Sequence, residues 1–177
     1  MTADVTASSP LGRRMDDLER VGARELAFLT QLSVRVRGEG GGTASVPLPS
    51  APNTWIEHDG REFLWLGPDE WLVVAPPGSR AEVLAALQRE LAGADPGLFD
   101  VSANRTVIEL AGEERFDLLE QGCGLDLHPS AWREGMCAQT LLAHVPVILQ
   151  ERDEATRVFV RPSFASSLLD WLVDAAS

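Results

Sequence analysis

The sequence of 177 residues contains no tyrosine, only two cysteines and only three histidines. Two cysteines are far below the density of a disulfide-stapled scaffold, and the first thirty residues lack the apolar core of a signal peptide, so we expect a cytoplasmic protein. Long apolar runs are absent too, since a stretch such as 71–75 is much shorter than the roughly 20 residues that span a bilayer. We therefore expect no membrane segment.

Basic residues are also scarce in this chain. Lysine plus arginine number 15 against 27 aspartates and glutamates, which gives a formal net charge of -12. Phosphate contacts dominate nucleic-acid affinity, and the overall field of the chain opposes them, so we expect no nucleic-acid partner. The acidic surface either serves solubility or complements a basic surface on a protein partner, and composition does not separate these two interpretations.

The pattern of the first half of the chain predicts strands that lead into a helix. A small, polar tail with Pro10 and Gly12 is followed by alternation over 28–37, which predicts a strand with one apolar face that Gly38–Gly42 ends. That face consists of Phe28, Thr30, Leu32, Val34 and Val36. The proline-rich stretch 46–54 is expected to be ordered but irregular.

Two apolar runs, 63–66 and 70–75, flank the turn-forming trio Gly67-Pro68-Asp69 and predict an antiparallel hairpin. Ser79 and Glu82 then have the spacing of a capping box, so a helix is expected to begin there and to end near Gly93.

The second half repeats this order of elements. Strands are expected over 98–101, 106–110, 137–143, 145–150 and 157–160. One helix opens at Glu113 and Glu114 and stops at Gly122, and a last helix carries an apolar stripe from Phe164 to Leu172. A short turn is expected between them over 127–135, with Pro129 suited to a first helical position. The pattern predicts an α+β fold of two pseudo-repeated sheet-plus-helix halves, because many strand connections are too short for a parallel crossover. We expect an arm over 1–20 and one domain over 21–177, with halves at about 21–95 and 96–177.

Residues that could carry chemistry form no convincing site. Cys123, His128, Cys137 and His144 could supply zinc ligands, but neither cysteine belongs to a C-x-x-C pair, and small buried thiols or a Cys123 to Cys137 disulfide are the alternatives. No serine lies in a G-x-S-x-G elbow. The glycines of 38–42 lead into prolines rather than a helix, which favours a loop over a dinucleotide site. We expect no catalytic, cofactor-binding or metal-binding residue in this chain.

Five tryptophans stand out, two of which flank the turn of the hairpin. Trp65 or Trp71 could project outward as an interface anchor, or both could pack inward. Asp100-Val-Ser-Ala-Asn-Arg105 is a polar cluster that either binds a ligand or stabilises a turn through its own side chains. The residues proposed from these two segments as a partner interface are Trp65, Gly67, Pro68, Asp69, Trp71, Asn104 and Arg105.

Several segments, in order along nearly the whole chain, resemble the gamma subunit of heterotetrameric sarcosine oxidase. The run Trp65-Leu-Gly-Pro-Asp-Glu-Trp-Leu72 is the most specific of them. The similar segments are 9–11, 28–31, 48–54, 65–72, 100–105, 122–127, 135–140 and 161–165. In addition, Leu-Phe-Asp-Val-Ser at 98–102 is similar to a segment in the opening domain of the aminomethyltransferase of the glycine cleavage system, which implies a folate-binding-type fold.

This resemblance implies an accessory subunit of an enzyme that oxidatively demethylates sarcosine to glycine. The FAD, FMN, NAD and tetrahydrofolate sites are then expected in the alpha and beta subunits, and the zinc in the delta subunit. The resemblance further implies that the gamma subunit binds none of them and docks on alpha. In the transferase, paired aspartates serve the one-carbon chemistry, whereas the matching stretch 141–149 contains no carboxylate. The alternative function is a stand-alone folate-binding or aminomethyltransferase-like protein, with a reduced site formed by Asp100, Asn104, Arg105 and Asp126.

Overall fold

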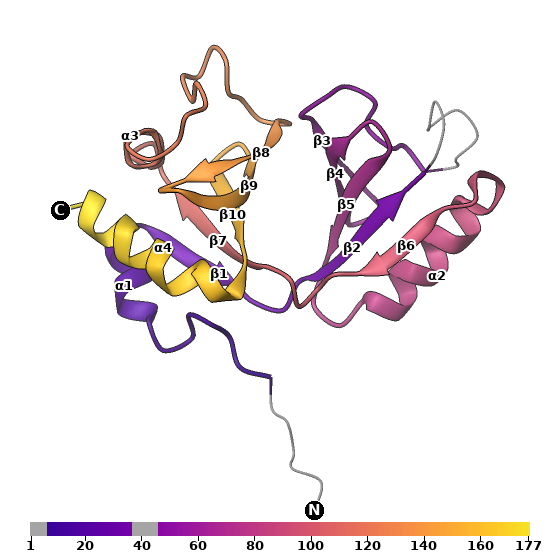
Figure 1. The fold of residues 1–177 in the computed structure, drawn as a ribbon, viewed down its shortest axis with the longest axis horizontal. Coiled ribbons are helices and arrows are strands. Elements are labelled where there is room, and N and C mark those ends of the chain that lie inside the picture. Colours follow the sequence, from indigo (N-terminus) through magenta and orange to yellow (C-terminus); the bar gives the residue numbers. More distant parts are fainter. Residues whose placement is uncertain (1–6, 37–45) are drawn as a thin grey trace, which may run out of the picture.

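The computed structural model describes residues 7–36 and 46–177. Two five-stranded antiparallel sheets face each other, and helices cover their outer faces (Figure 1). The expected glycine end of the strand over 28–37 lies outside the described residues. The α+β class that the pattern predicts is confirmed.

One sheet has the strand order β3-β4-β5-β2-β6 and carries one long helix. Its strands are β2 (Thr30–Arg35), β3 (Trp55–His58), β4 (Arg61–Gly67), β5 (Glu70–Ala75) and β6 (Gly97–Asp100). The long helix is α2 (Arg80–Glu90), which the short helix η1 (Ala92–Ala94) follows. The irregular stretch expected over 46–54 contains no helix or strand.

The second sheet has the strand order β1-β7-β10-β9-β8, and two helices from opposite ends of the chain lie together on it (Figure 1). Its strands are β1 (Ala23–Leu26), β7 (Thr106–Ala111), β8 (Cys137–Leu142), β9 (Val145–Glu151) and β10 (Ala155–Val160). The helices of this half are α1 (Met15–Arg20), α3 (Arg115–Glu120) and α4 (Pro162–Ala175).

The two halves repeat one topology but exchange their first strands. Strands β2 to β5 and the helix α2 of one half correspond, in pairing order, to β7 to β10 and α4 of the other. The first strand of each half, β1 or β6, completes the other half's sheet, because β1 pairs with β7 and β6 pairs with β2. The halves are therefore pseudo-repeats, but neither half forms its sheet alone.

Short segments carry the chain from one sheet to the other, as corners do where strands switch between packed sheets. Residues 27–29 link β1 to β2, and residues 101–105 link β6 to β7. We call them the crossing segments. The second of them packs against the start of β2, since the backbone N–H of Val101 donates to the carbonyl oxygen of Gln31 at 2.9 Å. The backbone of Phe28 has φ 62° and its side chain is 53% exposed, so the expected strand begins at Thr30 instead.

The core has three parts. One part lies between the second sheet and its helices, another between the first sheet and α2, and the third between the two sheets. The third part consists of Trp55, Leu64, Leu72, Val74, Val107, Cys137, Ile148 and Phe159. Alternation along each strand therefore sends one set of side chains toward the helices and the other toward the opposite sheet.

Part of the segment expected as an N-terminal arm over 1–20 packs against the second sheet. Leu11 and Leu18 are fully buried in the core beneath the second sheet's helices. Arg14 forms an ion pair with Asp170 of α4 at 2.7 Å. Residues from Leu11 onward are thus anchored by apolar contacts that the polar composition of 1–12 does not suggest.

Details of the predicted helix ends differ from the structure. Ser79 is the N-cap residue of α2, but its hydroxyl donates to the carbonyl oxygen of Pro76 at 2.7 Å instead of closing a capping box. The helix ends at Glu90, before Gly93, and Asp95 adopts the left-handed conformation that the expected glycine cap would supply. The short turn expected over 127–135 is present, and Pro129 lies in it without starting a helix.

Candidate partner interface

The hairpin of β4 and β5 exposes only its tip. Trp65 and Trp71 are paired across the two strands, as the sequence predicts. Pro68 and Asp69 are exposed at the turn between them, whereas Gly67 is half-buried. The carbonyl oxygen of Asp69 accepts a hydrogen bond from the backbone N–H of Val36 at 3.1 Å, which ties the turn to the end of β2.

Trp71 belongs to the core, so its assignment as a partner contact is wrong. Its side chain is 3% exposed and packs in the apolar cluster between the first sheet and α2. The indole Nε1 donates to the carbonyl oxygen of Pro49 at 2.8 Å, which satisfies the one polar atom of the ring. Trp65 is half-buried against the same cluster. The proline-rich segment thus provides the acceptor that allows Trp71 to pack inward.

Asn104 and Arg105 lie in the crossing segment between β6 and β7. Asp100 stabilises this segment, because its Oδ1 accepts from the backbone N–H of Ser102 at 3.0 Å and from the Ser102 hydroxyl at 2.6 Å. These bonds lower the pKa of Asp100 below its usual value. The exposed Asn104 donates its backbone N–H to the carbonyl oxygen of Val101 at 2.9 Å. The turn interpretation of 100–105 is therefore correct for Asp100 and Ser102.

The structure separates the hairpin tip from Asn104 and Arg105. Thr30 follows a crossing segment and pairs with Ala75 at one end of β5, while Arg35 pairs with Glu70 at the other end, beside the tip. The full length of β5 lies between them. Pro68 and Asp69 therefore lie at one end of β5 and the backbone of Arg105 at the other, although the charge of Glu70 still acts on the Arg105 side chain.

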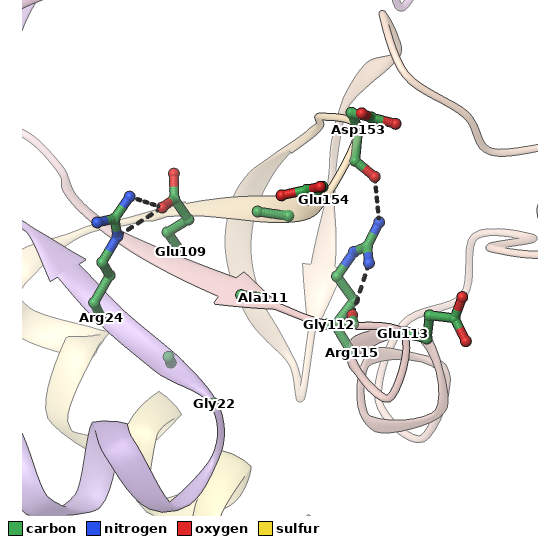
Figure 2. Close-up of a pocket in the computed structure, with 11 residues that line it drawn as sticks. Gly22, Arg24, Glu109, Ala111, Gly112, Glu113, Arg115, Asp153 and Glu154 are labelled. Atoms are coloured by element: carbon green, nitrogen blue, oxygen red, sulfur yellow. Dashed lines mark hydrogen bonds and ion pairs between the residues drawn. The ribbon is translucent and has the colours of Figure 1, made fainter.

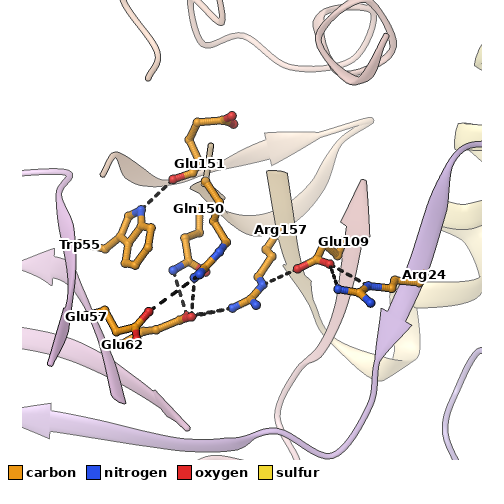
Figure 3. Close-up of polar contacts among 9 residues, drawn as sticks. Arg24, Trp55, Glu57, Glu62, Glu109, Gln150, Glu151 and Arg157 are labelled. Carbon is orange, nitrogen blue, oxygen red and sulfur yellow. Dashed lines mark hydrogen bonds and ion pairs between the residues drawn. The ribbon is translucent and has the colours of Figure 1, made fainter. Parts of the chain in front are cut away.

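A ladder of charged side chains joins the two sheets, and sequence reasoning missed it (Figure 3). Glu62 of β4 accepts hydrogen bonds from Arg157 of β10 at 2.9 Å and from Gln150 of β9 at 3.0 Å. Arg157 also binds Glu109 of β7 at 2.8 Å, and Glu109 in turn binds Arg24 of β1. Burial opposes ionisation of Glu109, but the two arginines outweigh it and lower its pKa.

The sequence signal for this ladder is weak. Each member is a single polar or charged residue in a strand, at a position that faces the other sheet, and only the pairing of distant strands shows which of them meet.

A hollow of about 680 Å³ opens where β1, β7 and β10 meet the start of α3 (Figure 2). Glu113, Asp153 and Glu154 line it. Arg115 at its wall is already engaged, because its guanidinium donates to the carbonyl oxygens of Gly112 at 2.7 Å and Asp153 at 3.4 Å. Within residues 7–36 and 46–177, no group of three or more histidine, cysteine, aspartate or glutamate side chains could hold a metal ion.

The two cysteines are both free thiols, so the disulfide alternative is wrong. Cys123 lies 3.9 Å from the Thr140 hydroxyl, and Cys137 is buried between the sheets, where its thiol donates to the carbonyl oxygen of Thr54 at 3.3 Å. Burial raises the pKa of Cys137 to about 12.

In the described part of the chain, no helix is long and apolar enough to cross a membrane.

The raised pKa of Cys137 predicts a loss of stability at alkaline pH. The unfolded thiol ionises near pH 8.5, while the folded thiol keeps its proton up to about pH 12. Between these values the unfolded chain binds fewer protons, so the free energy of unfolding falls as pH rises, by about 1.4 kcal/mol per unit. Between about pH 8 and pH 10, the free energy of unfolding of the wild type in urea should therefore fall by about 2 kcal/mol more than that of Cys137→Ala. Equal losses in the two proteins would contradict this.

The fold of this chain resembles that of a solved transferase structure. It is similar to aminomethyltransferase T of the glycine cleavage system from Bartonella henselae, with a TM-score of 0.60 and 12% identity. That match covers 93% of this chain and 49% of the transferase chain. The two-sheet α+β architecture is therefore the fold that the transferase uses over half its length.

Residues 44–177 match the model of the sarcosine oxidase gamma subunit family. Sarcosine oxidase subunit gamma from Corynebacterium sp. (strain P-1) is 39% identical over 167 residues, which cover 87% of this chain and 79% of the relative. The Arthrobacter sp. subunit gamma is 39% identical over 86% of this chain and 78% of its own length. This chain belongs to the sarcosine oxidase gamma subunit family.

A solved structure agrees with this membership. A chain of the heterotetrameric sarcosine oxidase from Corynebacterium sp. U-96, in complex with pyrrole 2-carboxylate, superimposes with a TM-score of 0.84 and 31% identity. The match covers 96% of this chain and 94% of that chain.

Proposed function

We propose that this chain is a non-catalytic subunit that assembles with alpha, beta and delta subunits into a cytoplasmic sarcosine oxidase. The assembly oxidatively demethylates sarcosine to glycine, and the chain docks on the alpha subunit. FAD, FMN, NAD, tetrahydrofolate and zinc are held by the other subunits. The free thiols of both cysteines support a reducing compartment.

The observation that carries this proposal is the match, over nearly the whole chain, to a chain of a heterotetrameric sarcosine oxidase. The internal bonding of the polar residues supports a structural role. The carboxylates of Glu62, Glu109 and Glu151 all bind arginines of this same chain. The buried Cys137 thiol is a poor nucleophile, because the thiolate is the reactive form and its pKa is strongly raised.

The test compares the purified chain with the assembled enzyme. Alone, the chain is expected to be colourless, to hold no stoichiometric metal and to leave sarcosine unoxidised. Added to companion subunits expressed without it, the chain should increase the yield of intact assembly and of sarcosine-dependent peroxide production. A flavin absorption band that stays with the isolated chain through gel filtration would contradict the proposal. Dimethylglycine, assayed beside sarcosine, identifies the preferred N-methyl substrate.

The fold it shares with the transferase makes a stand-alone folate-binding protein the second candidate. Its reduced site would need Asp100, Asn104, Arg105 and Asp126 together. Asp126 instead accepts a hydrogen bond from the backbone N–H of His128 at 3.1 Å, and Asp100 binds Ser102 and Arg80. No hydrogen bond or ion pair of the described residues joins Asp126 to the other three. Titration of the chain with tetrahydrofolate distinguishes the candidates, since saturable binding would favour the folate protein.

A further inference from the structure

Arg105 and Arg161 lie next to each other at the crossing end of the second sheet. Thr106 of β7 pairs with Val160 of β10, so the residues just beyond this pair, Arg105 and Arg161, stand opposite each other. Figure 1 shows that α4, which Arg161 precedes, begins beside the crossing segments. Alternation places both arginines on the face toward the other sheet, like Val107 and Phe159 two residues away in the inter-sheet core.

These two arginines lack a counter-ion of their own. In the described ranges, neither guanidinium forms a hydrogen bond or an ion pair. Glu70 of the facing sheet is the acidic residue whose charge acts on Arg105, but its carboxylate already pairs with Arg35 at 2.8 Å. Burial lowers the pKa of Arg105, and the neighbouring Arg161 lowers it further. Like charges opposite each other across strands are destabilising, so an external anion would relieve a real repulsion.

An exposed aromatic ring lies on the face of the first sheet that is directed toward the second sheet. Phe99 of β6 is 57% exposed and pairs with Ser33, on the opposite face of the strand from the core residue Leu98. Its ring covers Gly97, where an added Cβ would lie 3.0 Å from the Phe99 ring and 3.6 Å from the Cβ of Arg35. Phe99 therefore lies on the same face of the first sheet as the Arg35–Glu70 pair, and the charge of Glu70 acts on Arg105.

We propose that Arg105, Arg161 and Phe99 form the site where an acidic segment of a companion subunit docks. We call these three residues the arginine surface. The inference rests on the proposed function, because it takes the occupant to be part of the same enzyme assembly.

The chemistry of the arginine surface selects a carboxylate partner. All 15 basic residues of the chain are arginines, in a protein with a net charge of -12, so two adjacent unpaired arginines are a local exception to an acidic surface. A guanidinium group presents a planar fork that binds a carboxylate through two parallel hydrogen bonds. Arginine and aromatic side chains are also the types enriched at the energetic centres of protein interfaces. A second copy fits poorly, because in a two-fold dimer centred here the arginines would face their own counterparts.

The experiment removes the positive charges and leaves shorter, neutral, polar side chains. The double variant Arg105→Gln with Arg161→Gln removes both guanidinium groups, and its matched control is Arg89→Gln with Arg133→Gln. The control arginines are exposed, form no ion pair in the described part of the chain, and change the net charge by the same amount. Each full chain is titrated into companion subunits expressed without it, and its melting temperature is measured separately.

The double variant should bind at least about thirty-fold more weakly, as loss of an interface hot spot does, while the control changes less than about two-fold. Its melting temperature should be unchanged or higher, because a like-charge repulsion is gone. Added salt should weaken wild-type binding more than binding of the double variant. Unchanged affinity, or an equal fall in the control, overturns the proposal.

Phe99→Ala provides an independent variant if the double variant fails to fold. Phe99 is exposed, so its loss should leave the melting temperature nearly unchanged yet weaken assembly about ten-fold or more. Unchanged assembly of Phe99→Ala overturns the proposal. If the wild-type chain alone dimerises and the double variant does not, the occupant is a second copy and the proposal is wrong. If the wild type fails to bind the companion subunits, the proposed function fails instead.

Discussion

Replacement of Trp71 by alanine is expected to lower the free energy of unfolding of the full chain by about 3 to 5 kcal/mol, as large-to-small changes of buried aromatic residues do. Trp71 is 3% exposed and lies in the same apolar cluster as Leu32 and Val73. Removing the ring leaves a cavity between the first sheet and α2, and it also leaves the carbonyl oxygen of Pro49 without its indole donor. Urea unfolding measures the loss.

Two comparisons separate packing from polar bonding at this position. Trp71→Phe keeps most of the ring volume but removes the Nε1 donor, so it should show a smaller loss of about 1 to 3 kcal/mol. Trp65→Ala should also be milder than Trp71→Ala, because Trp65 is only half-buried. If Trp71→Ala left stability within about 1 kcal/mol of the wild type and weakened assembly instead, Trp71 would be an interface residue after all.

The second large effect is expected at Glu151. This side chain is 2% exposed, and its Oε1 forms an ion pair at 2.7 Å with Arg115, which is 6% exposed. Its Oε2 accepts from the indole of Trp132 at 2.9 Å and from the hydroxyl of Thr156. Glu151→Ala leaves a buried guanidinium charge without its partner, and we expect it to lower the free energy of unfolding by about 3 to 5 kcal/mol.

A second substitution tests the reason for that loss. Arg115→Met together with Glu151→Leu removes both charges and keeps apolar volume, so it should be more stable than Glu151→Ala alone. Arg80→Ala is the control, because the Arg80–Asp100 pair has side-chain exposures of 62% and 37% and should contribute less than about 1 kcal/mol. If Glu151→Ala lowered the free energy of unfolding no more than Arg80→Ala does, the buried Arg115–Glu151 pair would not stabilise the protein as expected.

Local patterns predicted most of the elements correctly. The hairpin of β4 and β5 follows from two apolar runs around Gly67-Pro68-Asp69, and its register pairs the two tryptophans. The helices α2 and α4 follow from apolar residues at helical spacing, such as Leu168 and Leu172, both fully buried. These features depend on residues close together in the chain, so a single sequence contains the information they need.

The faces of the strands could not be predicted in the same way. Alternation along 70–75 separates Trp71 from Leu72 but does not say which face meets the helix, and both faces are in fact buried. Phe28 shares the period of β2 and still lies outside it, because the chain bends there to reach the other sheet. The same limit applies to the predicted interface, which contained Arg105 but not its neighbour Arg161.

The sequence by itself determined the α+β class, the repeated order of strands and helix, and the family resemblance. All three depend on the spacing of apolar residues along short stretches and on short segments similar to those of the family. Only the tertiary structure decided that β1 and β6 exchange sheets, that Trp71 packs inward, that Glu62 meets Arg157, and that Arg105 stands beside Arg161. Each of these features is stabilised by contacts between segments far apart in the chain, and no local pattern specifies which segments meet.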